Sequence, residues 1–312
     1  MPLRFLAPNY WPTWVGLGIL RLLERLPYPW IVRVGHSIGW LARQLPLNYI
    51  RVARCNLRLC LPELSDAERE ALLDRHFREL GVGLCEIAMS WWSSNARIGN
   101  LAQIEGLEHL RQALTQGHGA ILLTAHFTTL EISARIINGV TPISFLYRAP
   151  KNALLAFMAE RNRARLGHRA IDRDDVRGML RALKDNCCVW YAPDQSYRRK
   201  GAEMVPFFGV PAATNVFTSR LARLSGAAVL LYSHERLPGA RGYRVCISPV
   251  LTDFPGPSPI ADTERFNGFI ESWVRRTPAQ YWWIHRRFKG LSCDYPNYYG
   301  KAARRPSTEP AI

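Results

Sequence analysis

The chain has 312 residues, enough to bury a sizeable core in one large domain or two small ones. Its 41 lysines and arginines outnumber 25 acidic residues and give a formal charge of +16, which favours an anionic partner: nucleic acid, an anionic membrane or a phosphorylated substrate. Ten tryptophans, several of them near the N-terminus, favour the membrane, and seven cysteines without a paired C-x-x-C spacing support neither a zinc site nor a disulfide framework.

Residues 1–45 are predicted to be a helical membrane-anchoring segment. Trp11–Leu20 is apolar but shorter than the roughly 20 residues that a spanning helix needs, and no small-residue cleavage site of a signal peptide follows it. Arg33, His36 and Arg43 are spaced to form a polar stripe on a following interfacial helix. We expect a marginal span or an embedded hairpin, then the interfacial helix; a pair of buried core helices is the alternative.

The middle of the chain predicts an α/β fold, a mostly parallel sheet flanked by helices, over residues 46–298. Ser65 and Glu68 form a capping box for a long helix through about Trp92, with Gly81 and Gly83 as possible bends. From residue 104 onward, strands and helices alternate. The expected strands are 120–125, 143–147, 187–192, 227–232 and 243–247, and the expected helices are 130–137, 152–166, 176–184, 216–224 and 261–275. Residues 299–312 are predicted to be a disordered polar tail.

The most informative segment is an apolar run that ends in His126, with Glu131 five positions later. The run predicts a buried strand, and Thr128 with Glu131 predicts a helix N-cap, so His126 should face a cleft at the strand-to-helix turn. A carboxylate beside the imidazole N–H fixes its tautomer and stabilises the imidazolium, which suits a general base acting on an alcohol. The alternative is a capping box beside an ordinary turn histidine; the spacing alone favours that alternative, and the surrounding sequence reverses the odds.

Two more polar residues follow predicted strands. Arg148 comes after strand 143–147 and Asp194 after strand 187–192, and open α/β sheets bind ligands at the carboxyl ends of strands. A solvated loop arginine and a turn-forming aspartate are the alternatives. Arg163 is a weaker candidate for substrate binding, because a surface position explains it equally well.

Two segments farther along are apolar or aromatic. Residues 205–214 form an apolar loop that either lines an acyl channel or packs in the core, and Thr214 is predicted to cap the next helix. Residues 281–289, YWWIHRRFK, interleave aromatic rings with cations that include Arg286. Such a segment suits contact with phosphates or headgroups at a membrane surface; stacking on nucleic acid bases is the alternative.

Taken together, these residues resemble the bacterial lipid A biosynthesis acyltransferases, the lauroyl/myristoyl family of the lysophospholipid acyltransferase superfamily. The resemblance covers residues 6–298, and its start looks like the lauroyltransferase branch. Glu131 matches the glutamate of the lipid A branch, whereas Gln195 departs from relatives that carry histidine there. The motifs that carry the resemblance are Pro8–Gly16, Leu26–Pro29, Asn56–Glu63, Tyr147-Arg148, Trp190–Asp194, Val205–Phe208 and Gln280–Lys289.

The resemblance implies an inner-membrane enzyme with its catalytic domain on the cytoplasmic face. It implies transfer of a fatty acyl group, with laurate expected, from acyl carrier protein to a hydroxyacyl chain of a Kdo-lipid IVA precursor. His126 is then the general base and Glu131 orients it; Arg148 stabilises negative charge or holds a phosphate, and Asp194 shapes the site. Arg163 and Arg286 are the further substrate-binding candidates.

The expected partners are acyl carrier protein, a phosphorylated glycolipid and the inner membrane, with no nucleic acid, no metal and no cofactor beyond the acyl-carrier donor. Basic residues would serve both acidic partners. A close alternative is an acyltransferase on another glycolipid, such as a mannosylated phosphatidylinositol. A different class is a non-enzymatic basic protein that binds membrane or nucleic acid, and for it His126→Ala would leave function intact.

Overall fold

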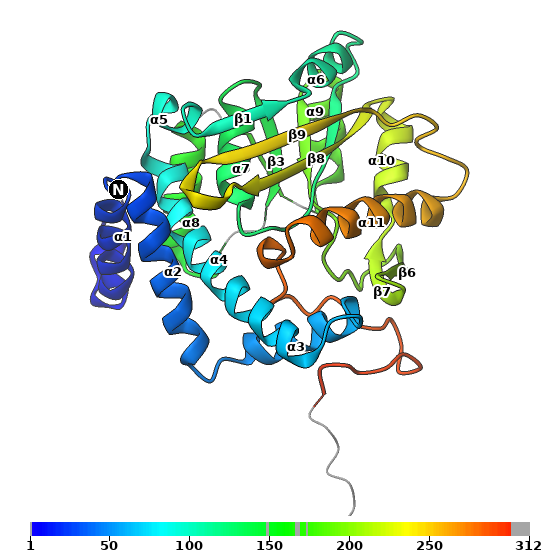
Figure 1. The fold of residues 1–312 in the computed structure, drawn as a ribbon. Coiled ribbons are helices and arrows are strands. Elements are labelled where there is room, and N and C mark those ends of the chain that lie inside the picture. The colour runs from blue at the N-terminus through cyan, green and yellow to red at the C-terminus, as the bar shows by residue number, and fades with distance from the viewer. Residues whose placement is uncertain (1, 148–149, 166–168, 173, 301–312) are drawn as a thin grey trace, which may run out of the picture.

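The structure is a computed structural model that describes residues 2–147, 150–165, 169–172 and 174–300 (Figure 1). Its centre is a seven-stranded sheet of order β1-β9-β8-β2-β5-β3-β4, in which every neighbouring pair is parallel except β8 with β9. The predicted α/β fold with a mostly parallel sheet is therefore confirmed. The strands are β1 Ala102–Glu105, β2 Ala120–Leu123, β3 Ile143–Tyr147, β4 Arg169–Asp172, β5 Cys188–Tyr191, β8 Ala228–Arg236 and β9 Tyr243–Val250.

Helices cover both faces of this sheet (Figure 1). Ile121 and Leu123 of β2 face one apolar core and Leu122 faces the other, as the two-residue period of a strand requires. All four β2 residues are buried, which is typical of a parallel strand covered on both sides. The helices are α1 Trp11–Leu23, α2 Tyr28–Gln44, α3 Asn48–Cys60, α4 Asp66–Trp92, α5 Asn95–Gly99, α6 Leu107–Leu114, α7 Leu130–Asn138, α8 Ala153–Arg165, α9 Val176–Lys184, α10 Phe217–Ser225 and α11 Pro259–Arg276, with short 3₁₀ turns at Leu3–Leu6, Pro8–Tyr10, Pro238–Ala240 and Pro278–Gln280.

The long helix α4 begins at the predicted capping box, in which the Ser65 side chain accepts from the Glu68 backbone and the Glu68 carboxylate accepts from the Ser65 backbone. Its glycines do not interrupt it. A Cβ at Gly81 would lie 2.1 Å from the carbonyl oxygen of Gly35, and one at Gly39 would lie 2.0 Å from that of Phe77. The missing side chains let α2 and α4 pack backbone to backbone, so one face of α2 belongs to the core, while Trp30, Trp40 and Leu41 are more than half exposed.

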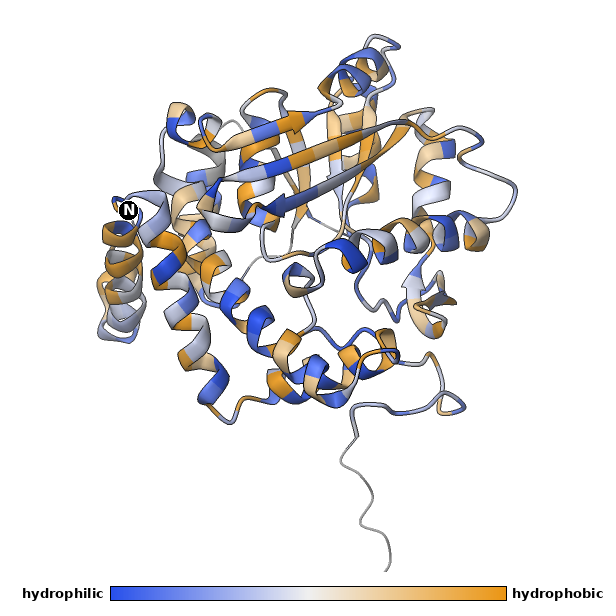
Figure 2. Ribbon diagram, in the orientation of Figure 1, coloured by the Kyte–Doolittle hydropathy of each residue, from blue (hydrophilic) through white to orange (hydrophobic). Residues whose placement is uncertain are grey.

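Helix α1 presents an apolar face to the outside of the molecule, visible in orange at the left of Figure 2. Trp11, Val15, Ile19 and Leu22 recur at helical spacing and each is more than half exposed. Among the described residues, none of the helices combines the length and the apolar character required to cross a membrane.

Three local predictions are wrong. Residues 205–214 belong to a hairpin of β6 Ala202–Phe207 and β7 Val210–Asn215, closed by Phe208 and Gly209 at positive φ, as a type I′ turn requires. Thr214 does not cap α10, since the Asn215 side chain accepts from the Phe217 backbone instead. Tyr299, assigned to the tail, is buried in the main core, while residues 301–312 of that tail lie outside the described residues.

Candidate active site

His126 and Asp194 meet at the carboxyl ends of two adjacent parallel strands. In the pairing of β2 with β5, Leu123 lies opposite Tyr191. His126 comes three residues after Leu123, and Asp194 comes three residues after Tyr191. His126 Nδ1 lies 2.6 Å from Asp194 Oδ1, and the His126 backbone N–H donates to Oδ2 at 3.0 Å. One carboxylate therefore fixes both the ring and the backbone of the histidine. Since an ionised carboxylate only accepts, the proton is assigned to Nδ1 and the lone pair to Nε2.

The carboxylate hydrogen-bonded to His126 Nδ1 is Asp194 and not Glu131, so the orienting role of Glu131 stays a prediction. Helix α7 begins at Leu130, as expected, but Thr129 and not Thr128 is at the N-cap, and no side chain caps it. Glu131 is half-buried in the first turn of α7. The sequence alone could not distinguish Asp194 from Glu131 as this carboxylate, because His126 and Asp194 follow two strands that are adjacent in the sheet but far apart in the chain.

Asp194 is almost completely buried, at 2% exposure, whereas the His126 side chain is 25% exposed. Burial raises the pKa of the Asp194 carboxyl, but the charge and hydrogen bonds of His126, assisted by Arg287, outweigh burial and hold that pKa below its usual value. The Tyr281 hydroxyl adds a contact to Oδ2 at 3.3 Å. The carboxylate thus stays charged behind an imidazole that solvent can reach.

The reachable side of His126 opens on a cleft of about 230 Å³. Its walls combine apolar and aromatic side chains with a few polar groups, as small-molecule sites do. The Ser196 hydroxyl and the Trp190 indole N–H are buried beside it and have no hydrogen-bond partner among the described residues. The cleft residues are His126, Leu130, Leu146, Asp174, Trp190, Tyr191, Ala192, Pro193, Gln195, Ser196, Tyr197 and Asn215.

Residues 280–289, which we name the C-terminal strap, tie the two halves of this site together. Its backbone pairs with the histidine turn, since the Gln280 carbonyl accepts from Thr128 at 2.7 Å and Trp282 N–H donates to the His126 carbonyl at 3.0 Å. The His285 ring accepts from the Ser196 backbone at 3.1 Å through Nε2. Burial lowers the pKa of His285 to about 4, so the ring is a neutral acceptor at pH 7.

Several aromatic and basic side chains of the strap are internal, whereas Arg286 and Lys289 are only half-buried. Tyr281, Trp283, Arg287 and Phe288 are buried. Arg287 donates to the carbonyl of Ala213 and to the hydroxyl of Thr214 in β7. A segment rich in rings and cations therefore packs here as core, a role that interleaving alone does not distinguish from surface binding.

Of the other predicted substrate-binding residues, Arg286 is described and half-buried, and its guanidinium lies 6.0 Å from the centre of the Tyr299 ring. It borders a hollow next to the site rather than the cleft itself. Arg148 lies outside the described residues. Arg163 is in α8, but its side chain also falls outside what the structure describes.

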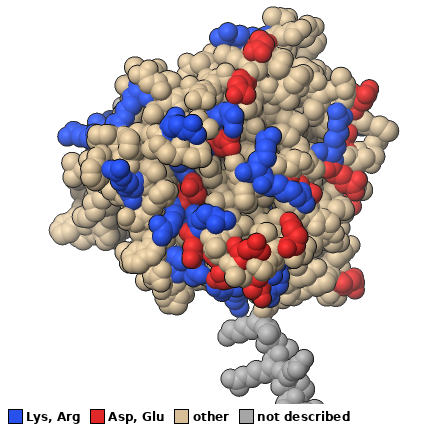
Figure 3. Space-filling model, viewed as in Figure 1, with Lys and Arg blue, Asp and Glu red and all other residues tan. Residues whose placement is uncertain are grey.

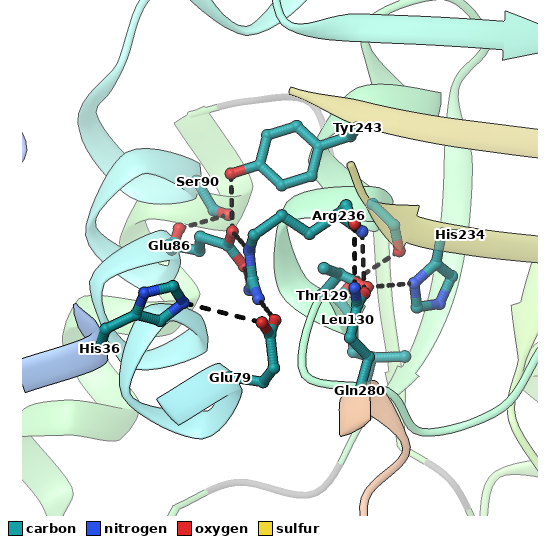
Figure 4. A network of polar contacts seen from close by, with 11 residues as sticks. His36, Glu79, Glu86, Ser90, Thr129, Leu130, His234, Arg236, Tyr243 and Gln280 are labelled. Carbon is teal, nitrogen blue, oxygen red and sulfur yellow. Dashed lines mark hydrogen bonds and ion pairs between the residues drawn. The ribbon is translucent and has the colours of Figure 1, made fainter. Parts of the chain in front are cut away.

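A buried polar network supports the histidine turn from behind (Figure 4). The Gln280 side chain is hydrogen-bonded to both backbone groups of Arg236, and the Thr129 hydroxyl lies 2.8 Å from His234 Nδ1. Arg236 in turn binds Glu86 and Glu79 of α4. Nothing in the sequence indicates this network, because a buried charged residue cannot be told from an exposed one in a single sequence.

Comparison with known proteins gives a consistent result. A family model described as bacterial lipid A biosynthesis acyltransferase matches residues 2–290. The chain is 40% identical to the lipid A biosynthesis palmitoleoyltransferase of Escherichia coli over 92% of the chain and 94% of the relative. It is 39% identical to a lipid A biosynthesis acyltransferase of Haemophilus influenzae, over 92% and 93%. It is 36% identical to the lipid A biosynthesis lauroyltransferase of Escherichia coli, over 94% and 96%.

Proposed function

The chain belongs to the bacterial lipid A biosynthesis acyltransferases, and from that premise we propose that it moves a fatty acyl group from acyl carrier protein to a hydroxyacyl chain of Kdo-lipid IVA. It is an acyltransferase, and the lipid A precursor fits its family. The donor, the Kdo-bearing acceptor and the chain length are the proposed parts. Laurate is the proposed acyl group, although one similar relative is named for palmitoleate.

The observation that carries the proposal is the His126–Asp194 pair at the cleft. With Nδ1 protonated and hydrogen-bonded to Asp194, Nε2 is free to take the proton of the acceptor hydroxyl. The resulting oxygen attacks the thioester carbonyl, the C–O bond forms, and the C–S bond breaks as the tetrahedral intermediate collapses. The imidazolium, stabilised by the Asp194 carboxylate, returns its proton to the departing thiolate.

The intermediate carries a negative oxygen that needs hydrogen-bond donors. We propose the Ser196 hydroxyl for this role, because it lies at the cleft, is buried and has no hydrogen-bond partner in the described part of the chain. Arg148 remains the second proposed group for this charge or for a substrate phosphate, with Arg163 as a further substrate contact. Glu131, half-buried in the first turn of α7, remains a proposed support of His126 beside the Asp194 contact.

The enzyme is proposed to work at the cytoplasmic face of the inner membrane. The outward apolar face of α1, with Trp11, Val15, Ile19 and Leu22, suits insertion into the interfacial layer of a bilayer. The net charge of +16 suits both proposed substrates, because a lipid A precursor carries phosphates and acyl carrier protein is acidic.

An acyl-transfer assay with the purified full chain tests the function. Lauroyl, myristoyl and palmitoleoyl thioesters of acyl carrier protein are offered with Kdo-lipid IVA or with a phosphatidylinositol mannoside, and products are weighed by mass spectrometry. We expect one added acyl chain on Kdo-lipid IVA, with laurate fastest, and a rate about 10²–10⁴ lower for His126→Ala. Transfer to the mannoside alone would select the other glycolipid, and no transfer to either would reject the proposal.

Membrane attachment is tested by side-chain replacement. Deleting residues 1–45 would strip α2 from α4 and uncover the core, so a quadruple change of Trp11, Val15, Ile19 and Leu22 to serine is the cleaner variant. We expect the wild-type protein to float with vesicles of bacterial phospholipids and the quadruple variant to stay behind, since each buried apolar side chain contributes about 1.5–3 kcal/mol. Equal flotation of both proteins would reject α1 as the attachment surface.

A further inference from the structure

A basic hollow of about 660 Å³ lies next to the cleft, on the other side of the C-terminal strap. Arg198, Arg286 and Lys289 supply its positive charge, and Phe288, Tyr295 and Tyr299 supply aromatic surface. Its volume is within the usual 300–1,000 Å³ of a small-molecule site. The remaining lining residues are Gly290, Leu291, Ser292, Cys293, Pro296 and Asn297.

The hollow adjoins the reaction site through Phe288, which lines both the hollow and the small void behind His126 and Asp194. Ser196 and Tyr197 line the cleft, and Arg198, the next residue, lines the hollow. Within the strap, His285 and Arg287 border the small void, whereas Arg286 and Lys289 border the hollow. The strap therefore contributes side chains both to the hollow and to the void beside the catalytic pair.

The three cations of the hollow are available for a ligand. Neither Arg198, Arg286 nor Lys289 has an ion pair with a carboxylate of the described residues, whereas the neighbouring Arg199 pairs with Asp174 at 2.6 Å. Asp294 stands close by in the chain, but its carboxylate accepts from Ser292 at 2.8 Å. Three unpaired cations around one concavity favour a ligand with two or more negative charges.

A second basic hollow holds about 730 Å³ and five arginines, of which Arg236 belongs to the buried network and Arg244 pairs with Glu235. Its other three arginines, Arg75, Arg241 and Arg276, have no ion pair with a described carboxylate. On the face shown in Figure 3, basic side chains stand beside acidic ones in several places. Charge alone therefore does not single out a site; the strap hollow is distinguished by Phe288, which also lines the small void beside His126 and Asp194, whereas no residue of the second hollow lines that void.

We propose that the basic hollow binds the anionic sugar headgroup of the acceptor, with Arg198, Arg286 and Lys289 holding its phosphate or carboxylate groups. This rests on the proposed function for the identity of the acceptor. A concave site with aromatic walls suits a sugar bearing acid groups better than it suits the convex surface of an acidic carrier protein. Headgroup binding there would leave the acyl chains to extend toward the cleft, where His126 meets the hydroxyl.

Cys293 gives a test that needs no turnover. It lines the hollow and is the one cysteine of the seven that is exposed rather than half-buried or buried, and all seven are free. The probe is the deacylated headgroup of Kdo-lipid IVA, and the readout is the rate at which a maleimide alkylates Cys293 in the full chain, with Cys293→Ser giving the background. We expect the headgroup to slow alkylation at least fivefold and Arg198→Ala/Arg286→Ala to remove most of this protection. Unchanged alkylation in its presence would overturn the proposal.

Kinetics supply the second arm. A charge-assisted hydrogen bond is worth about tenfold in binding, so Arg286→Ala and Arg198→Ala should each raise the KM for Kdo-lipid IVA about tenfold and leave the KM for acyl carrier protein unchanged. Arg241→Ala and Arg276→Ala in the other basic hollow are the matched controls, and neither should change these values. A raised KM for the carrier protein instead would mean that the hollow docks that protein, and would overturn the proposal. Headgroup protection of Cys293 without any acyl transfer would retain the site and reject only the proposed function.

Discussion

The His126–Asp194 and Arg236–Glu86 pairs both join a buried carboxylate to a cation-forming side chain, and they differ in what can reach them. Asp194 is buried, but its partner His126 is 25% exposed on the cleft. Glu86 and Arg236 are 1% and 4% exposed and bind through two hydrogen bonds of 2.6 Å (Figure 4). The first pair has an opening on one side, and the second is enclosed on all sides.

The chemistry of the two partners differs as much as their surroundings. Burial lowers the pKa of Arg236, but Glu86 and Glu79 outweigh burial and raise that pKa well above its ordinary value, so the guanidinium keeps its protons at any working pH. An imidazole titrates near neutral pH and can take and return a proton. A buried carboxylate therefore serves catalysis only where its partner is both titratable and accessible, and otherwise it holds helices and strands together.

Removal of the imidazole should have the largest effect on activity. His126→Ala deletes the base, and general base catalysis contributes about 10²–10⁴ in rate, so kcat should fall by that factor. The melting temperature should also fall, because the buried Asp194 carboxylate loses the ring N–H that donates to it. The measurement is initial rate of acyl transfer at saturating substrates, with a melting curve for the same sample. A rate within threefold of wild type would remove His126 from the mechanism.

Replacement of its carboxylate partner should come next. Asp194→Asn keeps the shape but lets the amide donate toward Nδ1, which favours the wrong tautomer, and we expect a loss of about 10²–10³ in kcat. The pH profile should change too, since the depressed pKa of Asp194 keeps the carboxylate charged as pH falls toward 5. Glu131→Gln is the matched comparison. A mild effect of Asp194→Asn with a severe effect on the pH profile from Glu131→Gln would return the orienting role to Glu131.

The sequence predicted the parts of this site that depend on short-range order. Strand β2, the turn with His126 and the position of Asp194 after β5 could all be inferred. An apolar run followed by a polar residue indicates a buried strand that ends at a turn, and this pattern lies within a few residues of the chain. The pairing of His126 with Asp194 rather than Glu131 could not be inferred, since it depends on which strands are neighbours. The hairpin β6–β7 was missed because its turn uses Phe208 instead of the usual asparagine or aspartate.

Burial explains the remaining misses. Arg287 of the strap resembles a surface cation in the sequence, and its enclosure by β7 follows only from the tertiary structure. The role of Gly35, Gly39 and Gly81 is likewise visible only in the tertiary structure, where they allow close contact of α2 with α4. The glycine face of α2 packs on α4, and Trp30 and Trp40 remain exposed, so the prediction of an interfacial helix stays open.

Breaking the enclosed Glu86–Arg236 pair should lower the free energy of unfolding and leave kcat nearly unchanged. Glu86→Gln leaves the Arg236 guanidinium with only Glu79 as a charged partner, and breaking a buried ion pair costs about 3–5 kcal/mol. We expect about 3 kcal/mol less free energy of unfolding in urea, and a kcat within about threefold of wild type for the folded protein. As the exposed counterpart, Glu235→Gln at the Arg244 pair should cost less than 1 kcal/mol. Equal costs for the two variants would show that enclosure does not set the strength of the pair.

The smallest predicted effect is a pH dependence of stability from His76, which is fully buried in α4 beside the strap. Its Nδ1 lies 2.9 Å from the Ala279 carbonyl, and burial lowers its pKa from 6.5 to about 4. In the unfolded chain His76 binds a proton below about pH 6.5, whereas in the folded chain it does so only below about pH 4. The free energy of unfolding is therefore undiminished above pH 6.5 and falls as the pH drops from 6.5 toward 4. Between pH 6.5 and 5 the loss in free energy of unfolding should be about 1.5 kcal/mol for this one residue.

Urea unfolding of wild type and His76→Gln at several pH values measures this loss. From pH 6.5 to 5, the free energy of unfolding should fall by about 1.5 kcal/mol more for wild type than for His76→Gln. His118→Gln, at an exposed position, should show the same pH dependence as wild type. Parallel slopes for wild type and His76→Gln would show that the buried ring takes up its proton without loss, and that enclosure by α4 and the strap is looser than the enclosure of Glu86 and Arg236.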